Sequence, residues 1–484
     1  MDKTQFIVLV LLTLASFMTA LDSTIVILAL PVMLTALHTD LSILVWVILI
    51  YILAVTIFST QLGKLGDLKG RAKMFNFGMI LFGIGSALCG LSTSAIELIG
   101  FRTIQALGGS LMTSNTMAIA SDYFRPEERG GFVFGTTSMG WNLGAVAGIL
   151  AGGIITTFIG WRWIFYINVP IAIFSFIIGL AYLRDRGGVR VKQDFDIYGA
   201  ITLGLSLGLL SMAGGITYAG GVGYNNVVGL MILLGLALFA IFIYIETRAK
   251  SPLISLRLFR IKMFTLSSFS YFFQYMANNA ILFLLIMYLQ GVRGGLNPFY
   301  ASIWLVPGYL LGSIAATFGG RLADRSDARV IASIGLTLQA VAYVLYDTLL
   351  TLTTPFYYIT IIASISGVGG AGMFFAANGK MVMLDVPRDM YGIASGTNRT
   401  IGNIGILLSF IIAIVVSSMA IPRSVAFQIF VGTSVLTPSL MAPFINSLHM
   451  AFRASLALIA VAIATSWSRT RVPMTQQRRI VDRP

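Results

Sequence analysis

The stretch LDSTIVILALP, Leu21 to Pro31, places one carboxylate inside a long apolar segment. The apolar run around it extends from about Gln5 to Leu37, which is long enough as a helix to cross a hydrocarbon core ~30 Å thick. Asp22 therefore falls near the predicted bilayer midplane, where a charge costs about 2.5 to 3.5 kcal/mol and needs a partner, a proton or water. We expect a functional role for Asp22. The alternative is an interfacial or helix-capping aspartate at a kink ahead of Pro31.

Composition supports a chain that crosses the membrane many times. Hydrophobic residues make up 57% of the chain and charged residues 10%, with a mean hydropathy of +0.89. A single cysteine, Cys89, excludes a disulfide framework within the chain and a cysteine metal cluster. His38 and His449 both lie near predicted span ends, so we expect no metal site and no cofactor other than protons as coupling ions.

Apolar runs bounded by charge, proline and glycine predict fourteen transmembrane helices. The segments 196–216 and 420–445 are the hardest to interpret, since the first is rich in glycine and the second is compatible with a re-entrant piece. The predicted spans are 6–36, 41–63, 74–94, 95–119, 131–157, 162–183, 196–216, 226–246, 264–290, 298–320, 328–350, 355–378, 392–419 and 446–467.

The basic residues test this topology, because cytoplasmic loops carry an excess of lysine and arginine. If the chain starts inside, 26 of its 32 lysines and arginines fall on the cytoplasmic side. The net charge of +14 is thus distributed by topology and is not gathered into a nucleic-acid-binding face. We expect a multi-pass protein of the cell membrane with both termini in the cytoplasm.

Two loops resemble each other and indicate an internal repeat. The loop after the second predicted helix reads GKLGDLKGRAK from Gly63 to Lys73, and the loop after the tenth reads GRLADRSDAR from Gly320 to Arg329. Two copies in the same orientation predict two parallel six-helix halves. The expected division is 1–183 for the first half, 184–262 for two inserted helices and basic loops, 263–467 for the second half, and 468–484 for a basic tail. The alternative for each loop alone is a tight turn with a capping aspartate.

These residues resemble the major facilitator superfamily, and within it the fourteen-span drug:proton antiporter branch. LDSTIVILALP looks like the first-helix motif of that branch, and LIGFRTIQALGG from Leu98 to Gly109 looks like its fourth-helix motif. The second-half segments LQGVRGGLNPFYASIWLVP and GIASGTNRTIGNIG also resemble the branch. The resemblance implies an all-α fold of two parallel six-helix bundles with two extra helices between them.

The fifth predicted helix resembles the antiporter motif of the branch, with isoleucine at Ile149 where the motif has proline. Glycines at every fourth position from Gly140 to Gly152 form a smooth stripe on one helix face. This stripe allows another helix to approach closely, and close packing without any bearing on transport is the alternative interpretation. The motif glycines are Gly135, Gly144, Gly148, Gly152 and Gly153.

Arg102 lies about seven residues into the fourth predicted helix. The free-energy cost of placing its charge inside the membrane is similar to that for Asp22. We expect the two to pair. The hypothesis is that Asp22 cycles between proton-bound and proton-free states, and that Arg102 tunes its proton affinity or competes with the proton. The alternative is a permanent ion pair that holds two helices together.

The resemblance also implies a cytoplasmic charge cluster that stabilises one end state of the transport cycle. Its alternative is simple anchoring at the membrane surface. The residues assigned to this cluster are Gly63, Asp67, Gly70, Arg71, Arg125, Arg129, Asp324 and Arg325.

A substrate cavity is expected at the midplane between the halves. Polar residues within predicted helices are its candidates, although interhelical hydrogen bonding is an equally simple explanation for them. Tyr271, Phe272 and Phe273 are candidate aromatic wall residues. The polar candidates are Gln105, Asn142, Gln274, Tyr275, Asn278, Asn279, Asn398 and Arg399.

The predicted function is proton-driven export of hydrophobic or cationic small molecules by a protein that is not an enzyme. Uptake by symport or uniport, and export of lipids or amphiphiles, remain alternatives because one scaffold supports them all. The expected partners are a small-molecule substrate and the lipid bilayer, with no nucleic acid, and we expect a monomer.

Overall fold

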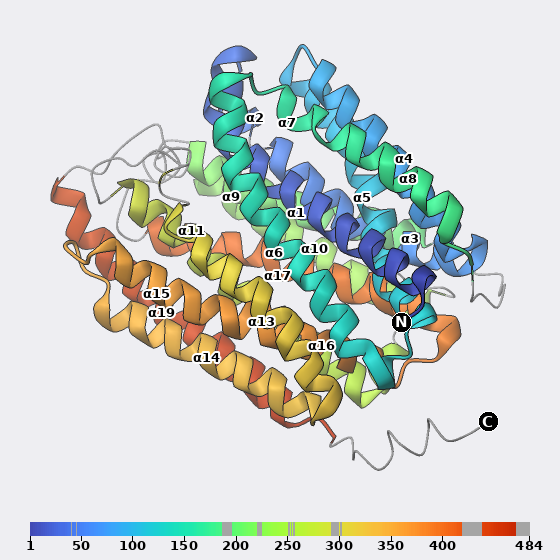
Figure 1. Ribbon diagram of the computed structural model, residues 1–484. Coiled ribbons are helices and arrows are strands. Elements are labelled where there is room, and N and C mark those ends of the chain that lie inside the picture. Colours follow the sequence, from blue (N-terminus) through green and yellow to red (C-terminus); the bar gives the residue numbers. More distant parts are fainter. Residues whose placement is uncertain are drawn as a thin grey trace.

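A computed structural model shows an all-helical chain (Figure 1). The structure describes residues 1–39, 41–44, 46–185, 196–219, 225–249, 252, 254, 257–291, 300, 303–418 and 438–470. Most of the basic loop after position 185, most of the segment 420–445 and the tail beyond position 470 lie outside the described residues.

Each of the fourteen predicted segments overlaps a helix of the described chain. The N-terminal helices are α1 (Lys3–Ala36), α2 (Leu41–Leu44), α3 (Trp46–Lys69), α4 (Arg71–Leu91), α5 (Ala95–Tyr123), α6 (Pro126–Phe158), α7 (Trp163–Tyr166) and α8 (Asn168–Tyr182). They are followed by α9 (Ile197–Ala219) and α10 (Asn225–Arg248). The C-terminal helices are η2 (Leu258–Arg260), α11 (Lys262–Gly291), α13 (Val306–Arg325), α14 (Ala328–Leu349), α15 (Phe356–Ser366), η3 (Gly367–Phe374), α16 (Phe375–Met383), η4 (Arg388–Met390), α17 (Tyr391–Ser418) and α19 (Pro438–Trp467).

Nine segments of the described chain are long and apolar enough to cross a membrane, so this is a multi-pass membrane protein. Other long helices, such as α5, carry many polar residues that are buried inside the bundle. The count of fourteen crossings therefore stays a prediction. The nine segments are Lys3–Val26, Trp46–Lys69, Arg71–Leu91, Glu128–Thr156, Trp163–Tyr182, Gly229–Arg248, Ala328–Leu349, Phe356–Met383 and Pro438–Trp467.

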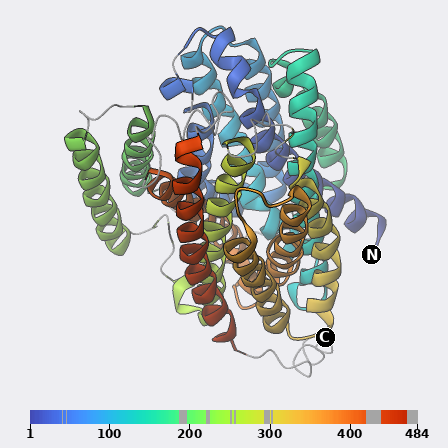
Figure 2. The same ribbon diagram turned by 90° about the vertical axis from the view of Figure 1, so that its left-hand side faces the viewer.

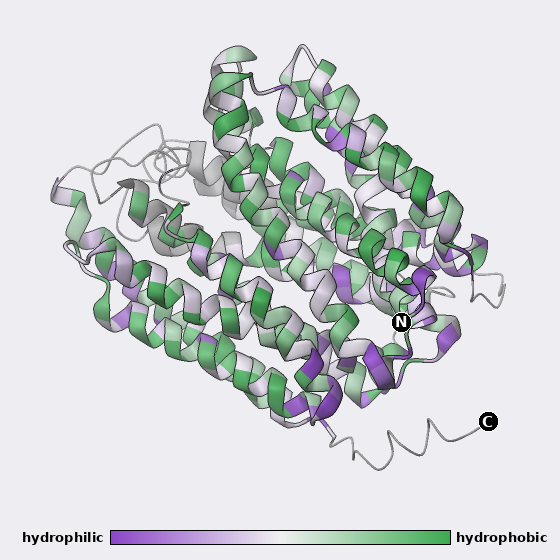
Figure 3. Cartoon of the chain, in the orientation of Figure 1, coloured by the Kyte–Doolittle hydropathy of each residue, from purple (hydrophilic) through white to green (hydrophobic). Residues whose placement is uncertain are grey.

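The N-terminal helices (α1–α8) meet the C-terminal helices (α11–α19) mainly through α6, which packs on α13 and α16, and through α17, which packs on α3 and α5. Within the first set α1 packs on α6 and α4 on α5, whereas in the second set α11 contacts both α17 and α19. The start of α1, the end of α19 and the α3–α4 and α13–α14 connections lie at one end of the bundle, which we call the basic end. Hydrophilic residues gather there (Figure 3).

Helices α9 and α10 lie to one side of the bundle (Figure 2). Helix α9 packs on α3 and α17, and α10 packs on α9. Helix α10 exposes large apolar side chains such as Leu230, Leu233 and Leu236, and α8 does the same with Phe174 and Ile177. Exposed apolar faces of this kind match a lipid environment.

Most predicted helix boundaries differ by several residues from the observed ones, and three differences in the helices have a clear local feature. The predicted helix 162–183 divides at Ile167, because Pro170 lacks the N–H that would bond the carbonyl of Tyr166. Helix α19 runs from Pro438 and not from 446, so it includes Pro443, a proline inside the helix. The predicted helix 355–378 contains a π-helical segment over the glycine-rich Gly367–Phe374.

Candidate functional site

Asp22 and Arg102 form a buried ion pair between α1 and α5. Arg102 Nη1 lies 2.6 Å from Asp22 Oδ2, and the two side chains are 1% and 0% exposed. The pairing that the sequence predicted is therefore present. Moving two charges out of water has a large free-energy cost, which is offset only when further hydrogen bonds satisfy both groups. The residues around the pair therefore decide its role.

Two amides complete the hydrogen bonding of the Asp22 carboxylate. Gln105 Nε2 donates to Asp22 Oδ1 over 2.8 Å, and Asn168 Nδ2 donates to the same oxygen over 3.2 Å. Both amides also donate to Ser86 Oγ, at 3.0 and 3.2 Å. Asp22 thus accepts from α5 and α8 at once, which ties its charge to the packing of three helices.

Arg102 has other partners besides the carboxylate. Its Nη1 also donates to Gln105 Oε1 over 2.7 Å, and its Nε donates to the carbonyl of Val47 over 3.1 Å. The guanidinium carbon lies 4.5 Å from the ring centroid of Tyr51, within the range of a cation–π interaction. Several contacts of Arg102 are therefore independent of the Asp22 carboxylate.

The ion pair is separate from the cavity that lies between the two sets of helices. Ser16 lies six residues before Asp22 on α1 and lines the cavity, whereas Asp22 faces α5 and α8. Six residues of helix correspond to about 9 Å. A single helix thus carries both the ionisable group and part of the cavity wall.

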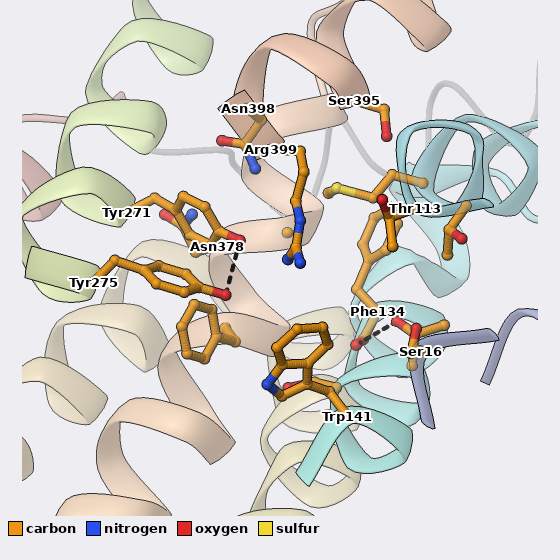
Figure 4. A pocket seen from close by; sticks show the side chains of 16 residues that line it. Ser16, Thr113, Phe134, Trp141, Tyr271, Tyr275, Asn378, Ser395, Asn398 and Arg399 are labelled. Atoms are coloured by element: carbon orange, nitrogen blue, oxygen red, sulfur yellow. Dashed lines mark hydrogen bonds between the residues drawn. The ribbon is translucent and has the colours of Figure 1, made fainter. Parts of the chain in front are cut away.

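The central cavity has a volume of about 140 Å³ and lies between the N-terminal and C-terminal helices (Figure 4). Hydroxyl, amide and aromatic side chains from both sets of helices line it, as expected for a small-molecule site. Its lining residues are Ser16, Thr113, Thr116, Met117, Phe134, Thr137, Ser138, Trp141, Tyr271, Tyr275, Phe375, Asn378, Gly379, Ser395, Asn398 and Arg399.

Three of the predicted polar cavity residues line this cavity, namely Tyr275, Asn398 and Arg399, and Tyr271 joins them as predicted. Sequence reasoning missed Trp141, which neighbours the predicted Asn142. Because adjacent helix positions point in directions about 100° apart, the register of α6 decides which of the two faces the cavity.

The other predicted cavity residues lie elsewhere. Gln105 belongs to the ion-pair network, and Gln274 donates to Gln339 Oε1 over 3.3 Å. Asn278 accepts from Gln339 and lines a smaller cavity of about 70 Å³ inside the C-terminal helices. Asn279 donates to the carbonyl of Tyr275 in its own helix. Interhelical or local hydrogen bonds explain these amides, which was the alternative interpretation.

Asn142 links α6 to the π-helical segment. Its Nδ2 donates to the carbonyl of Ala371 over 3.3 Å, and Ser138 Oγ donates to the same carbonyl over 3.1 Å. A π-helix shifts the register of backbone hydrogen bonds, and such segments occur at functional sites. Here it presents a backbone acceptor to the opposite set of helices beside the cavity.

The glycine stripe of α6 lies against α1. A methyl group at Gly144 would overlap the carbonyl oxygen of Phe17, and one at Gly148 would overlap Thr24 Oγ1. Gly135 instead faces α13, where a methyl group would overlap the carbonyl of Ala316. Gly152 is buried and Gly153 is partly buried, while Ile149 at the missing proline position is 8% exposed. Helix α6 thus contacts α1 and α13 closely.

At the basic end, Asp67 bridges the two sets of helices. Its carboxylate lies 2.7 Å from Arg71 and accepts the N–H groups of Gly392 and Ile393, both over 3.1 Å. These N–H groups belong to the first turn of α17, where unpaired donors and the helix dipole favour a negative charge. Asp67 therefore caps a helix of the other set.

Arg71 extends this cluster to residues that sequence reasoning missed. Its Nη1 lies 2.6 Å from Asp122, and its Nη2 donates to the carbonyl of Arg388 over 2.7 Å. Gly70 has a φ of +107° and packs against Asp185, which accepts the N–H of Ala72 over 2.7 Å. Gly63 packs against the backbone of α17.

Asp324 occupies the matching position at the end of α13. It accepts the N–H groups of Gly131 and Phe132 in α6, over 2.8 and 2.7 Å. The buried ammonium of Lys380 lies 3.0 Å from Asp324 Oδ1. The two aspartates of the repeated loops thus each accept backbone donors from the opposite set of helices.

Three predicted arginines of the charge cluster lie outside it. Arg125 pairs with Glu128 in its own helix over 3.2 Å and is largely exposed, and Arg129 and Arg325 are exposed as well. The Asp67 carboxylate is instead occupied by Arg71 and by two N–H groups of the α17 backbone. Long basic side chains at a helix end gain more by reaching water.

Comparison with known proteins places this geometry in a family. The family model "Major Facilitator Superfamily" matches residues 12–410. Multidrug resistance protein 3 of Bacillus subtilis (strain 168) is 34% identical over 416 residues, covering 84% of this chain and 78% of that protein. Riboflavin transporter RibZ of Clostridioides difficile (strain 630) is 29% identical over 409 residues, covering 84% and 87%.

The fold is also that of solved transporters. The proton:xylose symporter XylE aligns with a TM-score of 0.64 at 12% identity, over 96% of each chain. At that identity the likeness concerns the fold alone. Together with the family match, it shows that the chain belongs to the Major Facilitator Superfamily and is a transporter, not an enzyme.

Proposed function

We propose that the chain is a proton-coupled exporter of small organic molecules that works by alternating access. The observation that carries this proposal is the buried Asp22–Arg102 pair on the helix that also lines the central cavity. An ionisable pair inside a membrane bundle is costly, and proton relays are a common reason for it.

In the proposed cycle the proton and Arg102 compete for Asp22. A protonated carboxyl no longer attracts the guanidinium, which retains Gln105 and Val47 as partners. The position of α1 relative to α5 changes with this exchange. Because α1 packs tightly on the glycines of α6, its movement is transmitted to cavity residues on α6 such as Trp141.

The charges at the basic end provide the gate. Asp67 and Asp324 hold the opposite helices together in the described conformation, so the cavity is closed from that side. With the positive-inside topology, this end is cytoplasmic and the conformation is the one that opens outward. Release of both aspartates then opens the cytoplasmic path for substrate entry.

Two further features support export as the direction. Relatives of this chain include a protein named for multidrug resistance, and the antiporter-type glycine helix is present apart from its proline.

The proposed organisation is two six-helix halves, 1–183 and 263–467, with α9 and α10 inserted between them and a basic tail from 468 to 484. Both termini would be cytoplasmic, and the proposed transporting unit is one chain.

The test is proton release from energised vesicles that contain the protein. Inside-out vesicles with an acidic lumen are exposed to a panel of neutral, anionic and cationic aromatic compounds while a fluorescent dye reports the luminal pH. A transported compound makes the lumen more alkaline, because each antiport event carries protons out. We expect this response with the native protein and its loss in Asp22→Asn.

Asp2→Asn is the matched control, since Asp2 is an exposed aspartate that caps α1 by accepting the N–H of Gln5 over 2.6 Å. It retains the response if the effect belongs to the buried carboxylate. An undiminished response in Asp22→Asn contradicts the proposed coupling.

A further inference from the structure

Arg399 gives the central cavity a positive charge. Of the sixteen residues that line the cavity, one is an arginine and none is an aspartate or glutamate. Figure 4 shows the guanidinium group of Arg399 in the middle of the lining residues, with Tyr271 and Tyr275 on one side and Trp141 below. Any molecule that enters the cavity therefore meets this charge.

No carboxylate pairs with Arg399 in the described part of the chain. Its Nε atom is buried and lacks a hydrogen-bond acceptor there. The contact that it makes with an aromatic ring is to Trp141, at 4.8 Å from the guanidinium carbon to the ring centroid. This differs from the buried cations Arg71, Arg102 and Lys380, each of which lies within 3.0 Å of an aspartate.

Aromatic rings surround this guanidinium, and the Tyr271 hydroxyl is a neutral hydrogen-bond partner for it. Tyr271 and Tyr275 lie with their ring centroids 4.5 Å apart, and each contacts Phe375, at 5.5 and 5.2 Å. Trp141 closes another side of the cavity. A flat apolar ring finds edge and face contacts on several sides here.

We propose that the substrates of this cavity are aromatic organic anions, whose acidic group binds Arg399 and whose ring lies among the aromatic side chains of the cavity wall. This inference rests on the proposed transport function and names the substrate class. A carboxylate would supply the missing counter-ion and accept hydrogen bonds from the fork of the guanidinium, a geometry that arginine favours. A cationic ligand would instead meet a like charge in a low-dielectric site.

The inference reverses the sequence-based expectation of cationic substrates. The prediction named hydrophobic or cationic molecules, but the one carboxylate deep in a predicted helix, Asp22, pairs with Arg102 and does not line the cavity. The volume of about 140 Å³ limits the occluded ligand to about one ring with a small substituent, since a cavity of about 150 Å³ holds benzene. Larger substrates would need a more open conformation.

The test uses three probes of nearly equal shape and different charge: benzoate, benzamide and benzamidinium. Their affinities for the purified full-length protein in detergent are measured at pH 7 by isothermal titration calorimetry. A one-ring ligand with a charged contact binds at about 1 mM. We expect benzoate to bind at least about tenfold more tightly than benzamidinium, with benzamide between them.

Three variants test whether Arg399 causes the preference for benzoate over benzamidinium. Arg399→Gln is expected to lose the difference between benzoate and benzamidinium, while Arg399→Lys keeps a reduced preference for benzoate. Arg248→Gln is the matched control, because Arg248 is an exposed arginine on α10 that also lies over a ring, 4.7 Å from that of Tyr244. It should behave like the native protein.

Equal or tighter binding of benzamidinium by the native protein overturns the proposal, as does an unchanged preference in Arg399→Gln. Failure of benzoate to bind at about 10 mM, tenfold above the expected constant, also overturns it. The proposed function is tested separately by the vesicles. Proton release with cationic compounds alone would contradict the substrate class but not proton-coupled export, whereas no release with any compound would contradict export itself.

Discussion

Replacing Asp67 by asparagine should release the gate at the basic end. In the native protein this carboxylate pairs with Arg71 and accepts two N–H groups from the first turn of α17. Asparagine keeps one oxygen that can accept a hydrogen bond. Its NH₂ group would replace the second oxygen and would face another donor, either the Arg71 guanidinium or a backbone N–H group of α17. Hydrogen bonds to a charged group contribute about 1.5 to 3 kcal/mol, so we expect a loss of about 2 to 3 kcal/mol from the closed conformation.

This loss corresponds to an increase of about 30- to 150-fold in the ratio of open to closed molecules. The ratio can be measured by double electron–electron resonance between spin labels at Lys69 and Arg325, which are exposed ends of α3 and α13. The single native cysteine, Cys89, is buried and should not react with the label. We expect a longer-distance population to grow in Asp67→Asn.

The control is again Asp2→Asn, which removes a helix-capping charge without touching the opposite helices. Its distance distribution should match that of the labelled native protein. The reasoning is refuted if Asp67→Asn leaves the distribution unchanged, or if both variants shift it equally.

Two further variants test the packing and the second gate. Gly144→Ala should lower the melting temperature in detergent by an amount equivalent to about 1 to 3 kcal/mol, because its methyl group would overlap the carbonyl of Phe17. The matched change Gly100→Ala, at an exposed helical glycine with no neighbour within 4 Å, should be neutral or stabilising, and equal effects would contradict the close-packing argument. Asp324→Asn leaves the ammonium of Lys380 buried without its carboxylate and should cost about 3 to 5 kcal/mol by the same measurement. Adding Lys380→Met should restore most of that loss, and strictly additive effects would show that the pair contributes nothing.

The helices were predictable because apolar runs and punctuating residues are local features of the sequence. Asp22 and Arg102 were predictable as a pair because each is an isolated charge in an apolar segment, and pairing is the simplest way to reduce the cost of both. The repeated loops likewise pointed to Asp67 and Asp324 as residues with equivalent positions.

The partners of these residues were not predictable, because they depend on packing between distant segments. Asn168 is one amide in an apolar stretch, and its bond to Asp22 requires the break between α7 and α8. Asp67 accepts backbone N–H groups of α17, and no particular side chain in the sequence of α17 identifies these donors. Lys380 looked like an ordinary basic residue of a cytoplasmic loop, yet it is 1% exposed and pairs with Asp324.

The cavity was only partly predictable for a related reason. Polar residues within a spanning helix satisfy each other or line a cavity, and the sequence does not distinguish the two. Asn142 bonds the backbone of the opposite helices, whereas its neighbour Trp141 faces the cavity beside Arg399. A rotation of α6 by one residue would exchange these roles.

The most direct test of proton coupling through Asp22 is uphill transport in proteoliposomes. An imposed pH gradient drives accumulation of whichever compound releases the most protons in the vesicle assay, and its internal concentration is followed to steady state. The native protein should concentrate the compound above the external level. The variant Asp22→Asn, and the double variant with Arg102→Gln that leaves no unpaired buried charge, should reach equal concentrations on both sides and go no further. Accumulation by either variant to the native level would contradict the account.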